Sequence, residues 1–180
     1  MKILFFLIFS VIFAKGQSWD EMLLYNASFG GVNVATATLK SKKFKNIQNQ
    51  DILRIEFKAK SKPSLKYIFP INDKIIIDVD LNTWQPLKVS KKIREGSYKQ
   101  NSLSTYDHKN KIFFYNGDSI SYDGEIFNPY SLIYYFRTID FFSDANYEIQ
   151  VADNKKITPL KFFGDKKVKT KTVLGKFYAN

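Results

Sequence analysis

Strict alternation of apolar and polar residues is the dominant pattern along most of the chain. The clearest case is ILRIEFKAK, residues 52–60, in which apolar side chains alternate with polar and charged ones. Successive side chains of a strand point to opposite faces, so one face of this strand is expected to be buried and the other wet. The pattern recurs often enough to predict about nine or ten strands in an antiparallel sheet with one solvated face.

Short polar or glycine-containing stretches separate the predicted strands. Gly30-Gly31 supplies the positive φ angles that a tight hairpin needs. Further turns are predicted around Asn82 and at residues 108–110, and a short turn is predicted within residues 62–70. These turns are short, so consecutive strands are expected to be neighbours in the sheet.

The segment Pro129 to Phe142 departs from this alternation. Its apolar residues recur at spacings of three and four, which favours a helix; they are Leu132, Tyr135, Phe136 and Ile139. Asn128 suits the N-cap, and Pro129 suits the first helical position. A sheet with one wet face must cover the other. The predicted fold is therefore mainly β: a curved antiparallel sheet or open barrel of about nine or ten strands, with one short helix packed on the concave face.

The first residues predict export. MKILFFLIFSVIFAKGQ has a positively charged start, an apolar run of about a dozen residues and small residues before residue 17. We interpret residues 1–16 as a signal peptide that is cleaved near Gly16, and residues 17–180 as a single β-rich domain. The apolar run is shorter than a membrane span, so no transmembrane segment is expected after cleavage. The predicted location is the periplasm.

The amino-acid composition limits which kinds of site and partner are possible. The chain contains no cysteine, so disulfides, thiolate metal sites and a cysteine nucleophile are excluded. The net charge of +11 would attract anionic surfaces. For an exported protein the anionic surfaces are phospholipid head groups, lipopolysaccharide and wall polymers. Nucleic acid is therefore not an expected partner. A Lys-rich surface that only keeps the protein soluble is the alternative interpretation of this charge.

No motif predicts catalysis, a metal or another cofactor. The single histidine, His108, is predicted to be solvated in a hairpin turn, and one histidine cannot form a multi-histidine metal site. DVDLN, residues 78–82, resembles the start of a calcium loop, but Thr83 and Val89 stand where glycine and glutamate are needed. Carboxylates that could converge for glycoside chemistry are Asp118, Asp123, Glu125 and Asp140. Because nothing selects them, we expect a protein that is not an enzyme.

Several blocks together resemble a known family. They are YNASFGGVNVATATL, FPINDKIIIDVDLNTWQPLKVSKKIREGSY, STYDHKN and NPYSLIYYFRTIDF. They look like the bacterial exported family catalogued as domain of unknown function 3108, and the resemblance runs from about Leu24 to Phe177. The last block matches the Asp-Pro-x-Ser-Leu-x-Tyr-x-x-Arg-like motif of that family, with Asn128 where Asp is more usual. Family members usually continue beyond the signal seen here at Thr172–Phe177, which implies a truncated or short version.

The resemblance also suggests a function, because the family architecture is similar to the curved half-barrel of periplasmic lipoprotein carriers and receptors. It implies binding of a lipid or other amphiphile in the hollow of the sheet, with Arg137 near an anionic head group. The predicted ligand-binding residues are Leu132, Tyr135, Phe136, Arg137 and Ile139. A structural role for Arg137, bonded to backbone carbonyls at the helix end, is equally compatible with the sequence. The alternative function is an envelope assembly or scaffolding protein with a fully packed core and a basic partner-binding face.

Overall fold

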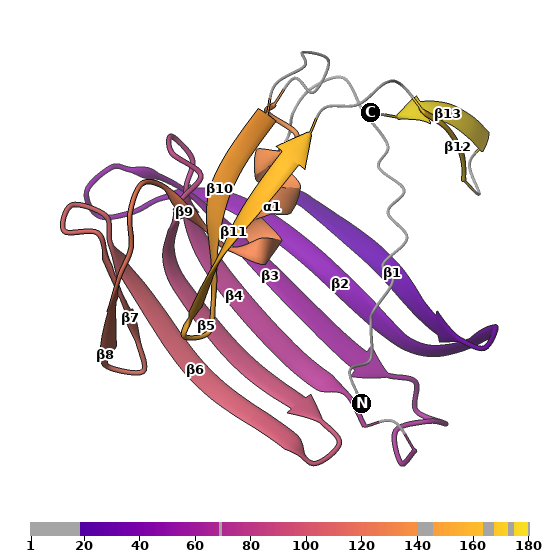
Figure 1. The fold of residues 1–180 in the computed structure, drawn as a ribbon. Helices are drawn as coiled ribbons and strands as arrows, with labels where there is room; N and C mark the ends of the chain where they lie inside the picture. The colour runs from indigo at the N-terminus through magenta and orange to yellow at the C-terminus, as the bar shows by residue number, and fades with distance from the viewer. Residues whose placement is uncertain (1–18, 69, 140–145, 164–167, 173–174, 180) are drawn as a thin grey trace.

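One large antiparallel sheet dominates the fold (Figure 1). The computed structural model describes residues 19–68, 70–139, 146–163, 168–172 and 175–179. Eight strands pair in the order in which they occur along the chain. They are β1 (Glu21–Phe29), β2 (Val32–Lys45), β3 (Asp51–Ser61), β4 (Asn72–Asp80), β5 (Pro86–Glu95), β6 (Tyr98–Asp107), β7 (Ile112–Tyr115) and β8 (Asp118–Ser121).

The remaining elements form two smaller sheets and one helix. β9 (Ile126–Phe127) pairs in parallel with β10 (Asn146–Asp153), which pairs antiparallel with β11 (Lys156–Phe163). β12 (Val168–Thr172) and β13 (Gly175–Ala179) form a separate hairpin. The helix α1 (Pro129–Tyr135) follows β9 directly. The predicted signal peptide lies outside the described residues.

The predicted mainly-β class is confirmed. The sheet is antiparallel and curved, one short helix lies against it, and it does not close into a barrel (Figure 1). The described residues contain thirteen strands rather than nine or ten. The difference arises partly because β8 and β9 are only four and two residues long. Such strands are too short for alternation to be recognised in the sequence.

Alternation decides which face of the large sheet is covered. Leu39 pairs with Phe57, and Ile55 pairs with Ile77, so these side chains share one face. We call it the inner face, since α1 packs against it, and the opposite face the outer face. Leu53, Ile55 and Ile77 are fully buried on the inner face. On the outer face Arg54 donates two hydrogen bonds to Asp78, of 2.6 and 2.8 Å.

α1 begins as predicted and ends earlier. The Asn128 side chain accepts a hydrogen bond from Tyr130 N at 3.1 Å, and Asn128 N donates to Ser131 Oγ at 3.2 Å, which completes a capping box. The helix ends at Tyr135 rather than Phe142, and residues 140–142 lie outside the described residues. Thr138 Oγ1 donates to the Tyr135 carbonyl at 2.7 Å, and Thr138 N donates to the same atom at 2.9 Å. This local bonding tightens the last turn and ends the helix.

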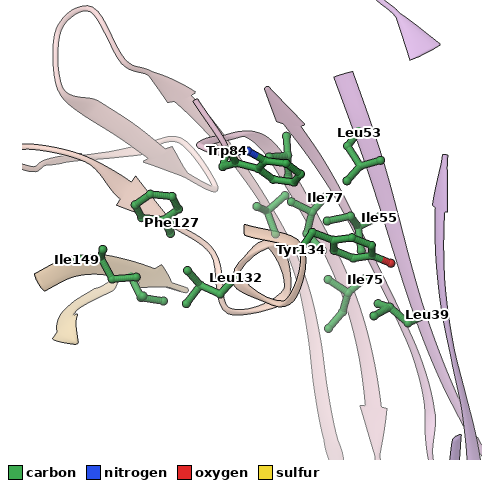
Figure 2. Packing of buried hydrophobic residues seen from close by; sticks show 13 residues of the cluster. Leu39, Leu53, Ile55, Ile75, Ile77, Trp84, Phe127, Leu132, Tyr134 and Ile149 are labelled. Atoms are coloured by element: carbon green, nitrogen blue, oxygen red, sulfur yellow. The ribbon is translucent and has the colours of Figure 1, made fainter. Parts of the chain in front are cut away.

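The core lies in layers between the inner face, α1 and the three-stranded sheet. Figure 2 shows Tyr134 directed at the strands that carry Leu39, Ile55 and Ile75, while Leu132 lies nearer Ile149. α1 therefore separates two apolar layers and contacts both. The apolar area that this arrangement removes from water is what holds the helix, since a helix of seven residues is not stable by itself in water.

Candidate functional site

The five predicted ligand-binding residues do not converge on one hollow. Leu132 is 6% exposed and belongs to the main core. Tyr135 stacks on Phe127 of β9, with ring centroids 4.7 Å apart, and Phe136 meets Phe162 of β11 edge-on at 4.7 Å. Ile139 is half-buried. Leu132, Tyr135 and Phe136 thus have structural contacts, and their role in ligand binding stays a prediction.

Arg137 is held by β1. Its Nη1 donates to Glu21 Oε1 at 2.6 Å, and its guanidinium carbon lies 4.9 Å from the centre of the Tyr134 ring. The partner is therefore a side-chain carboxylate 116 residues away in sequence. Burial raises the pKa of the Tyr134 phenol to about 12. This group of charged and aromatic side chains attaches the end of α1 to the edge strand of the sheet.

Beyond α1, small side chains form part of the inner face. Ala27 of β1 pairs with Ala35 of β2, and Ala37 of β2 pairs with Ala59 of β3. Because all four positions have inner-face parity, their methyl groups lie on the same side of adjacent strands. We call these four residues the alanine floor. Under α1 the same strands carry leucine and isoleucine, so the surface of the floor is lower than the surface beneath the helix.

Aromatic side chains border the alanine floor. Phe57 precedes Ala59 by two residues on the same face of β3, and its ring lies 5.3 Å from that of Tyr130 in α1. Tyr25 pairs with Ala37 in the sheet register. All three aromatic side chains are half-buried. Burial raises the pKa values of Tyr25 and Tyr130, so both phenols stay neutral at physiological pH.

No pattern in the sequence singles out these bordering aromatic residues. Tyr130 lies in the first turn of α1, outside the three-and-four spacing that identified the other helix residues. The signal that could have found the floor was present in the strands, because Ala35, Ala37 and Ala59 have the same parity as buried positions. Pairing register was the missing information, since it decides which strands bring their alanines side by side.

Polar contacts attach the β10–β11 turn to β5 and β6, on the part of the inner face away from the alanine floor. Lys91 of β5 is buried and forms an ion pair with Asp153, at the end of β10. Gln100 of β6 donates to Asn154 Oδ1 at 2.6 Å. The turn between β10 and β11 is therefore attached to β5 and β6 by charge-assisted and neutral hydrogen bonds. Lys91 has a partner that a buried ammonium group needs.

The prediction of a solvated His108 is wrong. The residue lies in the turn between β6 and β7, as expected, but it is half-buried and stacked on Tyr106 at 5.9 Å. Its Nδ1 lies 2.7 Å from the Tyr122 hydroxyl, and its Nε2 lies 2.7 Å from the Pro86 carbonyl oxygen. Both ring nitrogens are thus used to attach this turn to its neighbours. No sequence pattern shows contacts of this kind, because Pro86 is 22 residues away.

The acidic residues considered for glycoside chemistry give no site in the part of the chain that is described. Asp118, Asp123 and Glu125 are exposed, Asp118 pairs with Lys155 at 2.5 Å, and Asp140 lies outside the described residues. Among the described residues no group of three or more His, Cys, Asp or Glu side chains is placed to hold a metal ion.

Two surface hollows lie away from α1. The larger, about 390 Å³, is lined by the loop between β3 and β4, by the turn between β5 and β6, and by the adjoining ends of these four strands. The smaller, about 290 Å³, is lined by residues 20–22 and 40–42 at the edge of β1 and β2. Neither hollow has a lining residue from α1. Among the described residues no helix has both the length and the apolar character to cross a bilayer.

Comparison with known proteins identifies one matching family. A family model described as "Protein of unknown function (DUF3108)" matches residues 24–179, which is most of the chain. No curated protein and no solved structure gives a significant match.

Proposed function

We propose that this chain, which belongs to the DUF3108 family, is an exported, non-enzymatic protein of the periplasm that binds a lipid or similar amphiphile on its inner face. The observation that carries the proposal is the alanine floor with its aromatic border. An acyl chain needs an apolar surface, and four adjacent methyl groups provide a lower surface than leucine or isoleucine would. Ala35 and Ala37 are 3% and 9% exposed, so a bound acyl chain would have to displace the side chains that cover them.

The border suits an amphiphile better than a polar ligand. Tyr130 is half-buried in the first turn of α1, Phe57 is half-buried next to it, and Tyr25 is half-buried on β1. Rings at these positions can pack along a hydrocarbon chain over a large area at little cost in side-chain entropy. The floor ends at Ser61, where β3 enters its loop. A chain lying along the floor would thus place its polar group at the strand ends.

The proposal assigns a role different from the one predicted for α1. Leu132 belongs to the core, and Arg137 is attached to Glu21. We therefore place the amphiphile beside the first turn of α1, near Tyr130, and treat the helix as a packed wall. The five residues predicted from the sequence would then position this wall, and contact between the ligand and Tyr135, Phe136 or Ile139 is not required.

The test is native mass spectrometry of the protein as the cell exports it, purified from its own envelope without detergent. Extraction with organic solvent then identifies any molecule that was bound. The variant Ala59→Phe fills the floor with a ring, and Thr36→Phe adds a similar ring on the outer face of the neighbouring strand β2. We expect stoichiometric amphiphile on the unmodified protein and on Thr36→Phe, and its loss from Ala59→Phe at an unchanged unfolding midpoint.

An apo mass for the unmodified protein, both as purified and after incubation with envelope lipids, would refute amphiphile binding. Equal loading of Ala59→Phe and the unmodified protein would refute the alanine floor as its place. The first result would favour the second candidate, an envelope assembly or scaffolding protein with a packed core. That candidate is supported by the close packing of α1 between two apolar layers.

A further inference from the structure

Three chain connections meet at one end of the large sheet. They are the β1–β2 turn at residues 30–31, the loop between β3 and β4 at residues 62–71, and the β5–β6 turn at residues 96–97 (Figure 1). Gly96 N donates to the Pro70 carbonyl at 2.8 Å, and Lys62 N donates to the Val34 carbonyl at 2.9 Å. These bonds join the β3–β4 loop to the β5–β6 turn and to the beginning of β2. We call this end of the sheet, with its three connections, the loop end.

Among the described residues that line the hollow of about 390 Å³ at the loop end, four are cationic and none carries a carboxylate. The cations are Lys60, Lys66, Arg94 and Lys99, and the other lining residues are Ser61, Pro70, Ile71, Asn72 and Gly96. The ion pairs found among the described residues include none of these three lysines. Farther along the same outer face the situation differs, since Lys58 and Lys74 both pair with Glu56. Positive charge is thus concentrated at the loop end.

Three hydrogen bonds fix the position of the Arg94 guanidinium within this group of cations. Its Nη1 donates to the carbonyls of Ile93 at 2.6 Å and Gln100 at 3.1 Å, and its Nη2 donates to Asn101 Oδ1 at 3.0 Å. These acceptors are neutral, so they orient the guanidinium without cancelling its charge. The acid closest in sequence, Glu95, is directed to the inner face, where its carboxyl is hydrogen-bonded to Asp73.

Large apolar side chains are exposed at the same end. Tyr67 is 85% exposed and Ile68 is 68% exposed, both in the β3–β4 loop, and Val32 beside the β1–β2 turn is 56% exposed. The ammonium group of Lys66 lies 4.8 Å from the centre of the Tyr67 ring. Exposed aromatic and aliphatic side chains beside unneutralised lysines are the combination that suits the boundary between lipid head groups and acyl chains.

We infer that the loop end docks on the surface of a bilayer that contains anionic phospholipids. The lysines and Arg94 lie against the phosphates, and Tyr67 and Ile68 enter the head-group region. Charge complementarity selects this partner, because each basic residue near an anionic membrane surface strengthens binding by about five-fold. The exposed side chains of Tyr67 and Ile68 favour a membrane surface over a free phosphate ion as the partner. A phosphate ion would bind the cations only and would leave Tyr67 and Ile68 without a role.

The test is co-sedimentation of the exported protein with vesicles of phosphatidylcholine alone and of phosphatidylcholine mixed with phosphatidylglycerol. Binding to the anionic vesicles is expected, with little to the neutral ones. The triple variant Lys60→Gln, Lys66→Gln, Lys99→Gln should weaken it by about 100-fold. The matched control is Lys42→Gln, Lys88→Gln, Lys109→Gln, which removes the same charge near the opposite end of the sheet and should bind more tightly than the loop-end variant.

A second pair of variants isolates the apolar contribution. Tyr67→Ser with Ile68→Ser should reduce binding to anionic vesicles, whereas Ile47→Ser should not. Ile47 is fully exposed in the loop between β2 and β3, at the opposite end of the sheet. Equal losses for the two lysine triples would show that only total charge matters and would overturn the assignment. Binding of inorganic phosphate that depends on the loop-end lysines, without vesicle binding, would overturn it too.

This inference stands apart from the amphiphile site. The cationic hollow is on the outer face and the turns, whereas the alanine floor is on the inner face. Ala59→Phe should leave vesicle binding unchanged, and the loop-end triple should leave bound amphiphile unchanged. Failure of one proposal is therefore distinguishable from failure of the other.

Discussion

Replacing Leu132 by alanine tests whether this residue holds the layers of the fold together. Leu132 is 6% exposed and lies in α1 between the large sheet and the three-stranded sheet (Figure 2). The substitution removes three carbon groups from a buried position in α1, and this helix contacts both β4 of the large sheet and β10 of the three-stranded sheet. The matched control is Leu24→Ala on β1, where the same side chain is 72% exposed.

The expected loss follows from burial. Three carbon groups at roughly 0.8 kcal/mol each give about 2.4 kcal/mol of lost transfer free energy. The cavity left behind adds to this, so the free energy of unfolding should fall by about 3 kcal/mol. With a urea dependence of roughly 2 kcal/mol per molar, the unfolding midpoint should fall by about 1.5 M. Leu24→Ala should change the free energy by less than about 0.5 kcal/mol.

The assay is equilibrium unfolding in urea, followed by tryptophan fluorescence. Trp84 is buried in the same core and its ring centroid lies 4.8 Å from that of Trp19, so the signal reports on this region. If Leu132→Ala moved the midpoint no more than Leu24→Ala, the packed-wall description of α1 would be wrong. In that case Leu132 would be free to act as a ligand-binding residue, as the sequence analysis predicted.

Two further predictions concern the cap of α1 and the acid pair at the strand ends. Asn128→Ala should lower the unfolding free energy by about 1 kcal/mol because Tyr130 N loses its acceptor, and Asn128→Ser should restore most of it in urea unfolding; equal losses would contradict the capping role. The pKa of Glu95 is raised by burial and by its hydrogen bond to Asp73, so the folded chain keeps this proton to higher pH than the unfolded chain. The carboxyl thus lowers stability at neutral pH, and that stability returns as pH falls through the raised pKa. Glu95→Gln should raise the thermal midpoint at neutral pH and reduce its change on mild acidification, and an unchanged pH profile would contradict this.

Alternation predicted the large sheet well because each strand is buried on one side only. The parity of Leu53, Ile55 and Phe57 identified the inner face directly, and Gly30-Gly31 identified the first turn, where both residues have positive φ. The start of α1 was equally local, since an N-cap and a proline at the first helical position need only their neighbours. These features could be predicted because their causes lie within a few residues.

Other contacts join residues that are far apart in sequence. Arg137 reaches Glu21 across 116 residues, and Lys91 reaches Asp153 across 62. His108 appeared solvated because its turn is polar, yet the neighbouring strands provide acceptors and a stacking ring. Such pairings depend on the curvature of the sheet and on where the β10–β11 turn lies, which periodicity does not contain.

The sequence by itself determined the class of the fold, the wet and covered faces of its strands, the beginning of its helix and its family. Local sterics and burial of every second side chain are enough for these. Only the tertiary structure decided that four alanines lie side by side on the inner face, and that unpaired lysines and exposed Tyr67 and Ile68 meet at one end of the sheet. The physical reason is register: hydrogen bonding between strands brings residues from distant positions into one row, and a shift by one residue would move them to the other face.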